Sequence, residues 1–489
     1  MKYYFILLAV HLFFFIFLFD PFIRSDGVLF FWSTHSMIID GDLDFSNQFN
    51  DLPLAWMDVE SKTSTGLVFN VQNFGSSLMN SPLFLFAHAI SILGNFETSG
   101  YSILYTFFFN LGSVIYSFFG SVIIFHTLTK YFKYKKSDSL FATLLIVLAT
   151  PVLVYSLANT SFSSAHTFFA VSLFILIWVK FRNENSIRYW IFIGLCAGLI
   201  FMIRTVDAVF VLLPIIDVVL FKRKEYKKNF KKIGYIGIYA LFFIVAFSPH
   251  IFYWQILYGE PIPTPMPLDQ WYIIHDDPRG TFMNWTNPHF MEFFFSEHRG
   301  LFTWNPIFLL GVIGFYFLYK KHPQFAILAV IMSALMFYLH AAPNDWWGGG
   351  SFGQRRAADI APFLAIGLAA LLNRLAENTI SKISKGIILS SSIIWNVLFF
   401  LIFKWEHLAR VIPLQFYSDV FPHLVTPQFY ILNQIQRSFI LYRTKVMISD
   451  FGIHLDQIIW LAILSIPSII LLFIAFYTDI RKKLKQNAS

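Results

Sequence analysis

The chain has 489 residues, of which 57% are hydrophobic and 20% aromatic, while only 13% carry a formal charge. Soluble domains carry about a quarter charged residues, so this composition excludes an ordinary cytosolic enzyme and indicates a membrane protein with several spans. The formal net charge is +8, but it does not imply a nucleic-acid partner, because basic residues in so apolar a chain flank membrane spans. The single cysteine, Cys196, excludes a disulfide framework.

Apolar segments along the chain predict an all-α, polytopic membrane bundle of about twelve spans, each needing about 20 apolar residues. The first segment could be mistaken for a secretory signal. No small-residue cleavage site follows it, so we expect it to remain as a span. The predicted spans are residues 3–19, 101–129, 139–157, 165–181, 189–203, 206–220, 234–257, 303–319, 325–341, 358–373, 386–404 and 458–477.

Basic residues set the predicted orientation of these spans. We treat residues 77–94 as a helix lying in the membrane interface and divide the long stretch 189–220 near Arg204. One side then holds 24 of the 36 Lys and Arg residues but only five of the 28 acids, which marks it as cytoplasmic. Both termini are then cytoplasmic, and the predicted outer segments are residues 20–100, 258–302, 342–357 and 405–457.

These segments predict one transmembrane domain over residues 1–489. Within it, we expect residues 20–100 to form a long first extracytoplasmic loop with interfacial helices and the proposed catalytic acids. We expect residues 405–457 to form a late extracytoplasmic loop or a lid over the site. The absence of a repeat array or a low-complexity tail agrees with a single domain.

The first outer loop is strongly acidic, with eight acids against one base between residues 20 and 60. Single Asp residues often cap helices and turns, but an acid held at the membrane surface also suits a general base for an acceptor hydroxyl. Asp26 is the best placed, because an aromatic interfacial segment follows it. Asp42 and Asp44 form a D-x-D pair that suits a divalent cation, a candidate cofactor that the sequence does not require. Lys62 is this loop's candidate cation for a lipid phosphate.

The most distinctive motif is residues 345–356, which combine two tryptophans, four glycines and two arginines. Glycine lets the backbone approach a ligand closely, and the adjacent Arg355 and Arg356 suit bidentate phosphate contacts. The alternative is that both side chains extend to lipid headgroups. Arg204, three residues before Asp207, is either a further phosphate ligand or half of a local neutral pair.

These segments resemble the GT-C superfamily of bacterial glycosyltransferases, relatives of the protein O-mannosyltransferases and of the lipid A aminoarabinose transferase. The family implies a helical bundle with an extracytoplasmic active site, a polyprenyl-phosphate sugar as donor, and a first-loop acid as base, where Asp26 stands. The acid pair of the mannosyltransferases is here Asp26–Gly27, so Asp42 and Asp44 are candidates for the second acid. The likeness lies in Arg24–Gly27 leading to Ser36–Asp44, Asn73–Ser77 with Pro82, Trp304–Pro306, and Gly353–Arg356 with Pro362.

The sequence therefore predicts a sugar transferase of the bacterial inner membrane. Asp26 would activate a hydroxyl of a glycan, lipid or protein acceptor, while Arg355, Arg356 or Arg204 stabilises the departing lipid phosphate. No nucleotide-binding motif is present, which disfavours ATP-driven transport.

Three alternatives differ from this hypothesis in what the outer loops and spans would do. A transporter or flippase of lipid-linked glycans needs a polar path, which the few ionisable residues of the spans supply poorly. An O-antigen-ligase-like enzyme would take a pyrophosphate-linked donor. A structural or assembly subunit would use its outer loops as docking surfaces.

Overall fold

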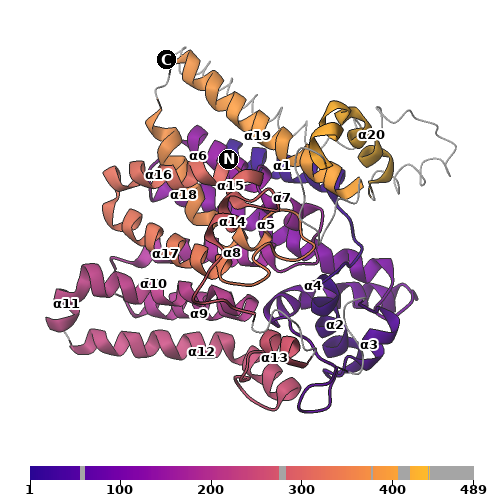
Figure 1. Ribbon diagram of the computed structural model, residues 1–489. Coiled ribbons are helices and arrows are strands. Elements are labelled where there is room, and N and C mark those ends of the chain that lie inside the picture. Colours follow the sequence, from indigo (N-terminus) through magenta and orange to yellow (C-terminus); the bar gives the residue numbers. More distant parts are fainter. Residues whose placement is uncertain are drawn as a thin grey trace.

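The computed structural model describes residues 1–54, 61–184, 186–228, 230–274, 282–375, 378–405, 419–438 and 440. These residues form helices, and among them strand pairing is limited to two isolated bridges, Lys62–Val68 and Met283–Pro343 (Figure 1). The predicted all-α class is confirmed. The first helices are α1 (Lys2–Leu18), α2 (Gly27–His35), π-helical η1 (Ser36–Asp40), α3 (Ser46–Asp51), α4 (Gly75–Leu93), α5 (Ile103–Lys130), α6 (Lys136–Leu148), α7 (Pro151–Leu157), α8 (Ser164–Phe181) and α9 (Ile187–Ile203).

The later helices continue the bundle and carry most of its irregular turns. They are 3-10 helix η2 (Thr205–Ala208), α10 (Val209–Asp217), π-helical η3 (Val218–Lys222), α11 (Arg223–Lys228), α12 (Phe230–Tyr258), α13 (Pro267–Ile274), α14 (Phe290–Phe295), α15 (Leu301–Trp304), α16 (Ile307–Lys321), α17 (Pro323–Ala341), 3-10 helix η4 (Arg355–Ala358), α18 (Ala361–Arg374), α19 (Thr379–Trp405), 3-10 helix η6 (Phe421–Val425) and α20 (Pro427–Arg437).

Six of the described helices are long and apolar enough to cross a membrane, or seven if α6 and α7 count as one bent span. The chain is therefore a multi-pass membrane protein. Helix α4, which the sequence analysis assigns to the interface, is one of the six. The predicted span 458–477 lies outside the described residues.

Several predicted spans are not single helices. Residues 139–157 bend by 71° between α6 and α7, where Thr150 caps the N-terminus of α7 and Pro151 occupies its first turn. Residues 206–220 combine a 3-10 turn, α10 and a π turn. Residues 303–319 break at Asn305, and α16 starts after Pro306, because proline favours a helix start over a helix interior.

At the bend between α6 and α7, two asparagine side chains donate hydrogen bonds to backbone carbonyls. Asn396 on α19 donates to the carbonyls of Leu148 and Thr150 at 2.9 and 3.0 Å. Asn305 donates to the carbonyl of Ala149 at 3.2 Å and to the side-chain oxygen of Asn396 at 3.0 Å. A break at membrane depth is tolerated only where such partners replace the lost helical bonds.

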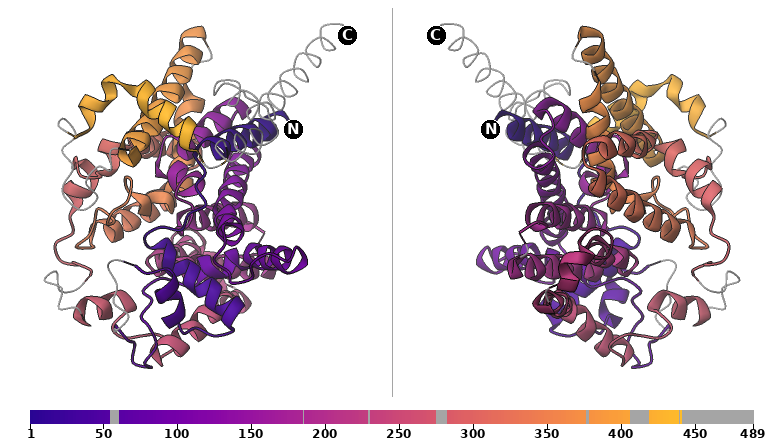
Figure 2. Two further views of the ribbon diagram at one scale, coloured as in Figure 1. Left: turned by 90° about the vertical axis from the view of Figure 1, so that its right-hand side faces the viewer. Right: turned by 90° about the vertical axis from the view of Figure 1, so that its left-hand side faces the viewer.

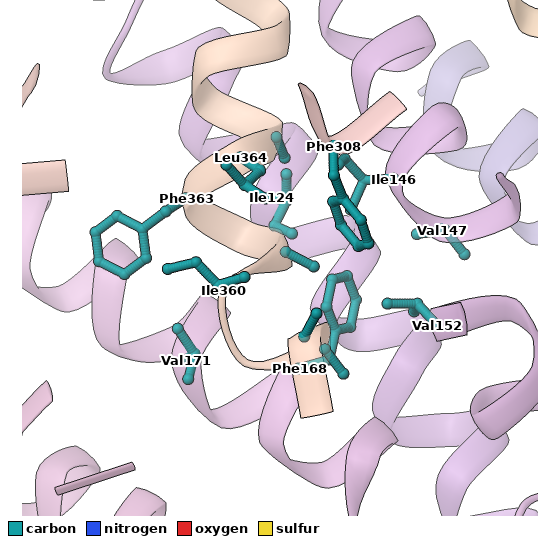
Figure 3. Packing of buried hydrophobic residues seen from close by; sticks show 14 of the residues in the cluster. Ile124, Ile146, Val147, Val152, Phe168, Val171, Phe308, Ile360, Phe363 and Leu364 are labelled. Atoms are coloured by element: carbon teal, nitrogen blue, oxygen red, sulfur yellow. The ribbon is translucent and has the colours of Figure 1, made fainter. Parts of the chain in front are cut away.

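The core lies between α5, α6, α7, α8, α16 and α18. Figure 3 shows Ile124, Phe168, Phe308 and Leu364 from four of these helices converging on one apolar cluster. This cluster supports the bent span, whose short second arm, α7, carries residues that hold the site.

Helices α16 and α18 cross at glycines. A Cβ added to Gly314 would lie 2.0 Å from the carbonyl oxygen of Gly367, and one added to Gly367 would lie 2.2 Å from that of Gly311. Small residues permit such close backbone packing between membrane helices.

We expect Gly314→Ala to destabilise the protein by about 1–3 kcal/mol, the usual cost of overpacking a well-packed contact. Gly386→Ala on α19 is the matched control, because nothing lies within 4 Å of its added Cβ, and alanine there favours the helix. Thermal unfolding in detergent measures both variants. Equal melting temperatures for the two would contradict this account of the crossing.

The first loop and the late loop lie at opposite ends of the molecule in Figure 2, with the indigo helices of the first loop at the bottom and α19 and α20 at the top. Helix α20 packs against the C-terminal end of α1, where Gln434 and Ser438 donate to the carbonyls of Phe17 and Ile16 at 2.6 and 2.9 Å. Of the predicted lid 405–457, only residues 405, 419–438 and 440 are described.

Candidate active site

The loop before η4 is held in place by the second arm of the bent span. The Tyr155 hydroxyl on α7 accepts from the Phe352 amide at 2.7 Å and donates to the Phe352 carbonyl at 3.3 Å. Arg299 donates to the Ser351 carbonyl at 2.6 Å. Gly353 has a φ of +57°, and a Cβ added to it would lie 3.1 Å from the Pro151 ring, so this turn favours glycine. These contacts fix where η4 starts and hence where its arginines lie.

The first-loop helix α2 docks on the segment between α7 and α8. A Cβ on Gly27 would lie 2.0 Å from Ser161 Oγ, so glycine at this position allows the close approach. Asp26 precedes α2 in a helical conformation, and its side chain makes no capping hydrogen bond. The carboxylate is therefore available for a partner outside its own helix.

That partner is Arg355. Arg355 Nη2 donates to Asp26 Oδ2 at 2.6 Å, and the guanidinium lies 4.9 Å from the ring centroid of Phe162. Burial alone would lower the pKa of Arg355, but the Asp26 carboxylate, with smaller contributions from Tyr155 and Asp345, raises it. The arginine stays cationic, and the structure brings together an acid and a base 329 residues apart.

Arg356 makes a second pair beside the first. Its Nη2 donates to Asp345 Oδ1 at 2.7 Å and its Nη1 to the Asp345 carbonyl at 3.2 Å. The side chains of both pairs are 15–19% exposed. The result is two adjacent guanidinium–carboxylate pairs that are partly exposed. Sequence reasoning did not select Asp345, although it lies in the distinctive 345–356 motif.

Arg204 makes its hydrogen bonds within the protein and joins neither of these two pairs. It donates to Ser163 Oγ at 3.0 Å, to Ser164 Oγ at 2.8 Å and to the Arg356 carbonyl at 3.3 Å. Ser164 in turn donates to the Arg355 carbonyl at 3.3 Å. Arg204 thus holds the backbone that carries the arginine pair.

The local pair between Arg204 and Asp207 does not form as an ion pair. Arg204 instead approaches Asp359 at 3.9 Å. The residue ends α9 in an extended conformation, so the i, i+3 spacing of an α-helix does not apply. Sequence reasoning missed Asp359 and its partner His340, because the contact joins segments distant in the chain.

The side chains of Asp42 and Asp44 accept hydrogen bonds from nearby residues of the same turns. Asp42 Oδ1 accepts from Ser36 Oγ at 2.7 Å and from the Asp44 amide at 3.1 Å, and Asp44 Oδ1 accepts from the amide and hydroxyl of Ser46. The continuous helix Gly27–Asp40, about 20 Å long, separates both acids from Asp26. The structure does not bring them to the arginine pair.

A metal centre has no support among the residues that the structure describes, where no group of three or more His, Cys, Asp or Glu side chains is placed to hold an ion. Lys62 is exposed on the bridge to Val68, and no ion pair to it is seen within the described ranges. The pair Asp42–Asp44 and Lys62 therefore stay candidates from sequence alone.

The fold is that of a helical membrane protein, and comparisons with known proteins show what it resembles. A family model described as dolichyl-phosphate-mannose-protein mannosyltransferase matches residues 106–254, from α5 into α12. The fold is similar to that of ArnT from Cupriavidus metallidurans in the apo state, with a TM-score of 0.51, 12% identity, and coverage of 96% of this chain and 75% of that chain.

The structure of the same ArnT bound to undecaprenyl phosphate is also similar, with a TM-score of 0.49, 12% identity and the same coverage of both chains. No curated protein matches the sequence significantly. The family match and the apo likeness confirm the predicted resemblance to GT-C enzymes and the predicted fold.

Proposed function

We propose that this protein transfers a sugar from a polyprenyl-phosphate donor to an acceptor hydroxyl on the extracytoplasmic side of the bacterial inner membrane, with both of its termini in the cytoplasm. The observation that carries the proposal is the Asp26–Arg355 pair at 2.6 Å, beside the second pair of Arg356. It joins a base for the acceptor to cations for the donor phosphate. The matching family model describes enzymes that use a dolichyl-phosphate sugar, which supports this class of donor.

In the reaction that we propose, the acceptor hydroxyl loses its proton to Asp26 as its oxygen bonds to the anomeric carbon of the sugar. The bond from that carbon to the phosphate oxygen breaks, and its electron pair stays on the phosphate. The donor phosphodiester carries one negative charge and the released phosphomonoester up to two. Asp26 meanwhile becomes neutral, so the negative charge moves from the base to the phosphate.

Arg355 and Arg356 can stabilise the negative charge that moves to the phosphate. Before the donor binds, Asp26 neutralises Arg355. The donor phosphate competes with Asp26 for Arg355 when it binds, and protonation of Asp26 then removes the competing charge while the phosphate gains charge. Cationic groups aimed at developing charge are a large source of catalysis in sites shielded from water.

The transport alternative has less support from the buried charges. Arg182 and Asp217 form a closed pair that also includes Gln324, and Lys385 pairs with Asp138 at 2.7 Å. Because each pair ties helices together, these four charges are not free to line a polar path.

The test compares glycolipids and glycoproteins of cells that express the wild-type gene, lack it, or express Asp26→Asn. Mass spectrometry should find one sugar modification that disappears both without the gene and in the variant, while the polyprenyl-phosphate sugar accumulates. An unchanged set of modified molecules, with normal expression of the protein, would refute the proposed function.

A further inference from the structure

Behind the arginine pair lies a group of polar side chains, the buried cluster, made of Arg204, Asp207, His340 and Asp359, of which only the Arg204 side chain is partly exposed. The two aspartates and the histidine are 0% exposed. His340 Nε2 and Asp359 Oδ2 are 2.8 Å apart, and Asp359 Oδ2 lies 3.9 Å from Arg204. None of these groups takes part in the reaction that we propose.

The two carboxyl groups of the buried cluster lie close together. The side chains of Asp207 and Asp359 are within hydrogen-bonding range, although neither Asp207 oxygen meets a donor from the other described residues. Two ionised carboxylates in contact and out of water repel strongly, so such a pair is stable when it shares one proton. The proton also supplies the missing donor.

The donors around the pair indicate where the proton resides. Asp359 Oδ2 contacts His340 Nε2 at 2.8 Å and lies 3.9 Å from Arg204, while Asp359 Oδ1 has no partner among the described residues. Asp207 has no comparable set of donors among the described residues. A carboxylate is favoured where donors converge, so Asp359 is the ionised partner and Asp207 the protonated one. One carboxylate and one guanidinium then leave the buried cluster neutral.

We propose that the Asp207–Asp359 pair holds a single proton and, together with His340, positions Arg204 so that Arg204 fixes the backbone of Arg355 and Arg356. This inference rests on the proposed function for its ligand, a polyprenyl phosphate. The path runs from Asp359 to the Arg204 guanidinium, and from there to the Arg356 carbonyl and, through Ser164, to the Arg355 carbonyl. The other three members of the buried cluster act through Arg204, so they are positioning residues.

The test measures binding of farnesyl phosphate, a short polyprenyl phosphate, to the full-length protein in detergent. Asp207→Asn preserves a neutral donor, so the Kd should stay within about threefold of the wild-type value. Asp359→Asn removes the carboxylate that lies 3.9 Å from Arg204 and should raise the Kd about tenfold, within the range for residues that modulate a site through another residue. Asp359→Asn combined with Arg204→Gln should bind as Arg204→Gln alone does, because the two residues act in one path.

Asp217→Asn is the matched control, because Asp217 also pairs with a buried arginine, Arg182, in a different contact. It should lower thermal stability without a specific change in farnesyl phosphate affinity. Additive effects of Asp359→Asn and Arg204→Gln, or equal damage from Asp207→Asn and Asp359→Asn, would overturn the proposal.

Infrared spectroscopy of the unliganded protein separates this inference from the proposed function. The spectrum of wild type minus Asp207→Asn should contain the C=O band of a protonated carboxyl group, whether or not the protein binds farnesyl phosphate. Absence of that band would overturn the shared proton. If the band is present and wild type fails to bind farnesyl phosphate, the proposed donor class is wrong while the proton assignment stands.

Discussion

Asp26→Asn is expected to lower the rate of sugar transfer at least 100-fold, since a positioned base contributes about 10²–10⁴-fold. The amide keeps the shape of the carboxylate but cannot accept the proton of the acceptor hydroxyl. Because the wild-type carboxylate lies 2.6 Å from Arg355 and competes with a phosphate for it, farnesyl phosphate should bind this variant at least as tightly as wild type. The rate of sugar transfer is measured as the incorporation of labelled sugar into the acceptor. The labelled donor lipid is extracted from the native membranes.

The matched control for this loss is Asp51→Asn, an exposed acid at the end of α3 in the same loop, which should retain wild-type transfer. Asp42→Asn and Asp44→Asn test the alternative acids. If either of these abolished transfer while Asp26→Asn stayed active with intact folding, the base assignment would be wrong.

Arg355→Gln and Arg356→Gln should each weaken farnesyl phosphate binding by about 10- to 100-fold. A hydrogen bond between charged groups contributes about 1.5–3 kcal/mol, and glutamine removes the positive charge. Arg355→Gln also leaves Asp26 without its partner. Lysine at either position should restore only part of the affinity, because it keeps the charge but loses the planar fork.

Arg188→Gln serves as the control for the arginine variants, because Arg188 is exposed at the start of α9. The Arg188→Gln variant should bind farnesyl phosphate with the same affinity as wild type. Salt titration adds a second check, since partly exposed ionic contacts weaken as ionic strength rises. Unchanged affinity in both Arg355→Gln and Arg356→Gln would contradict the role of this pair.

The helical membrane fold could be predicted because apolar runs report on local structure. The breaks within those runs were harder to predict. Residues 139–157 form one apolar stretch in sequence, yet the chain bends at Thr150 and Pro151. The bend depends on hydrogen bonds from Asn305 and Asn396, and residue spacing does not reveal partners 156 and 248 residues away.

In the candidate site, too, the residue types could be predicted from the sequence, but the contacts between distant segments could not. Asp26 and the arginine pair stand out through residue type and position near predicted membrane surfaces. Arg204 is visible as a charge inside an apolar run, but its direction is not, because Asp359 and the serines that orient it come from other segments. The local geometry around Asp42 and Asp44 agrees with the turn-capping alternative, which their spacing alone could not separate from a cation site.

The most direct test of the proposed site is a structure of the full-length protein with farnesyl phosphate. We expect the phosphate to contact both Arg355 and Arg356, with the Asp26 carboxylate displaced from Arg355 toward the space for an acceptor. A phosphate bound elsewhere, with the Asp26–Arg355 and Asp345–Arg356 pairs intact, would contradict the central claim that Arg355 and Arg356 bind the donor.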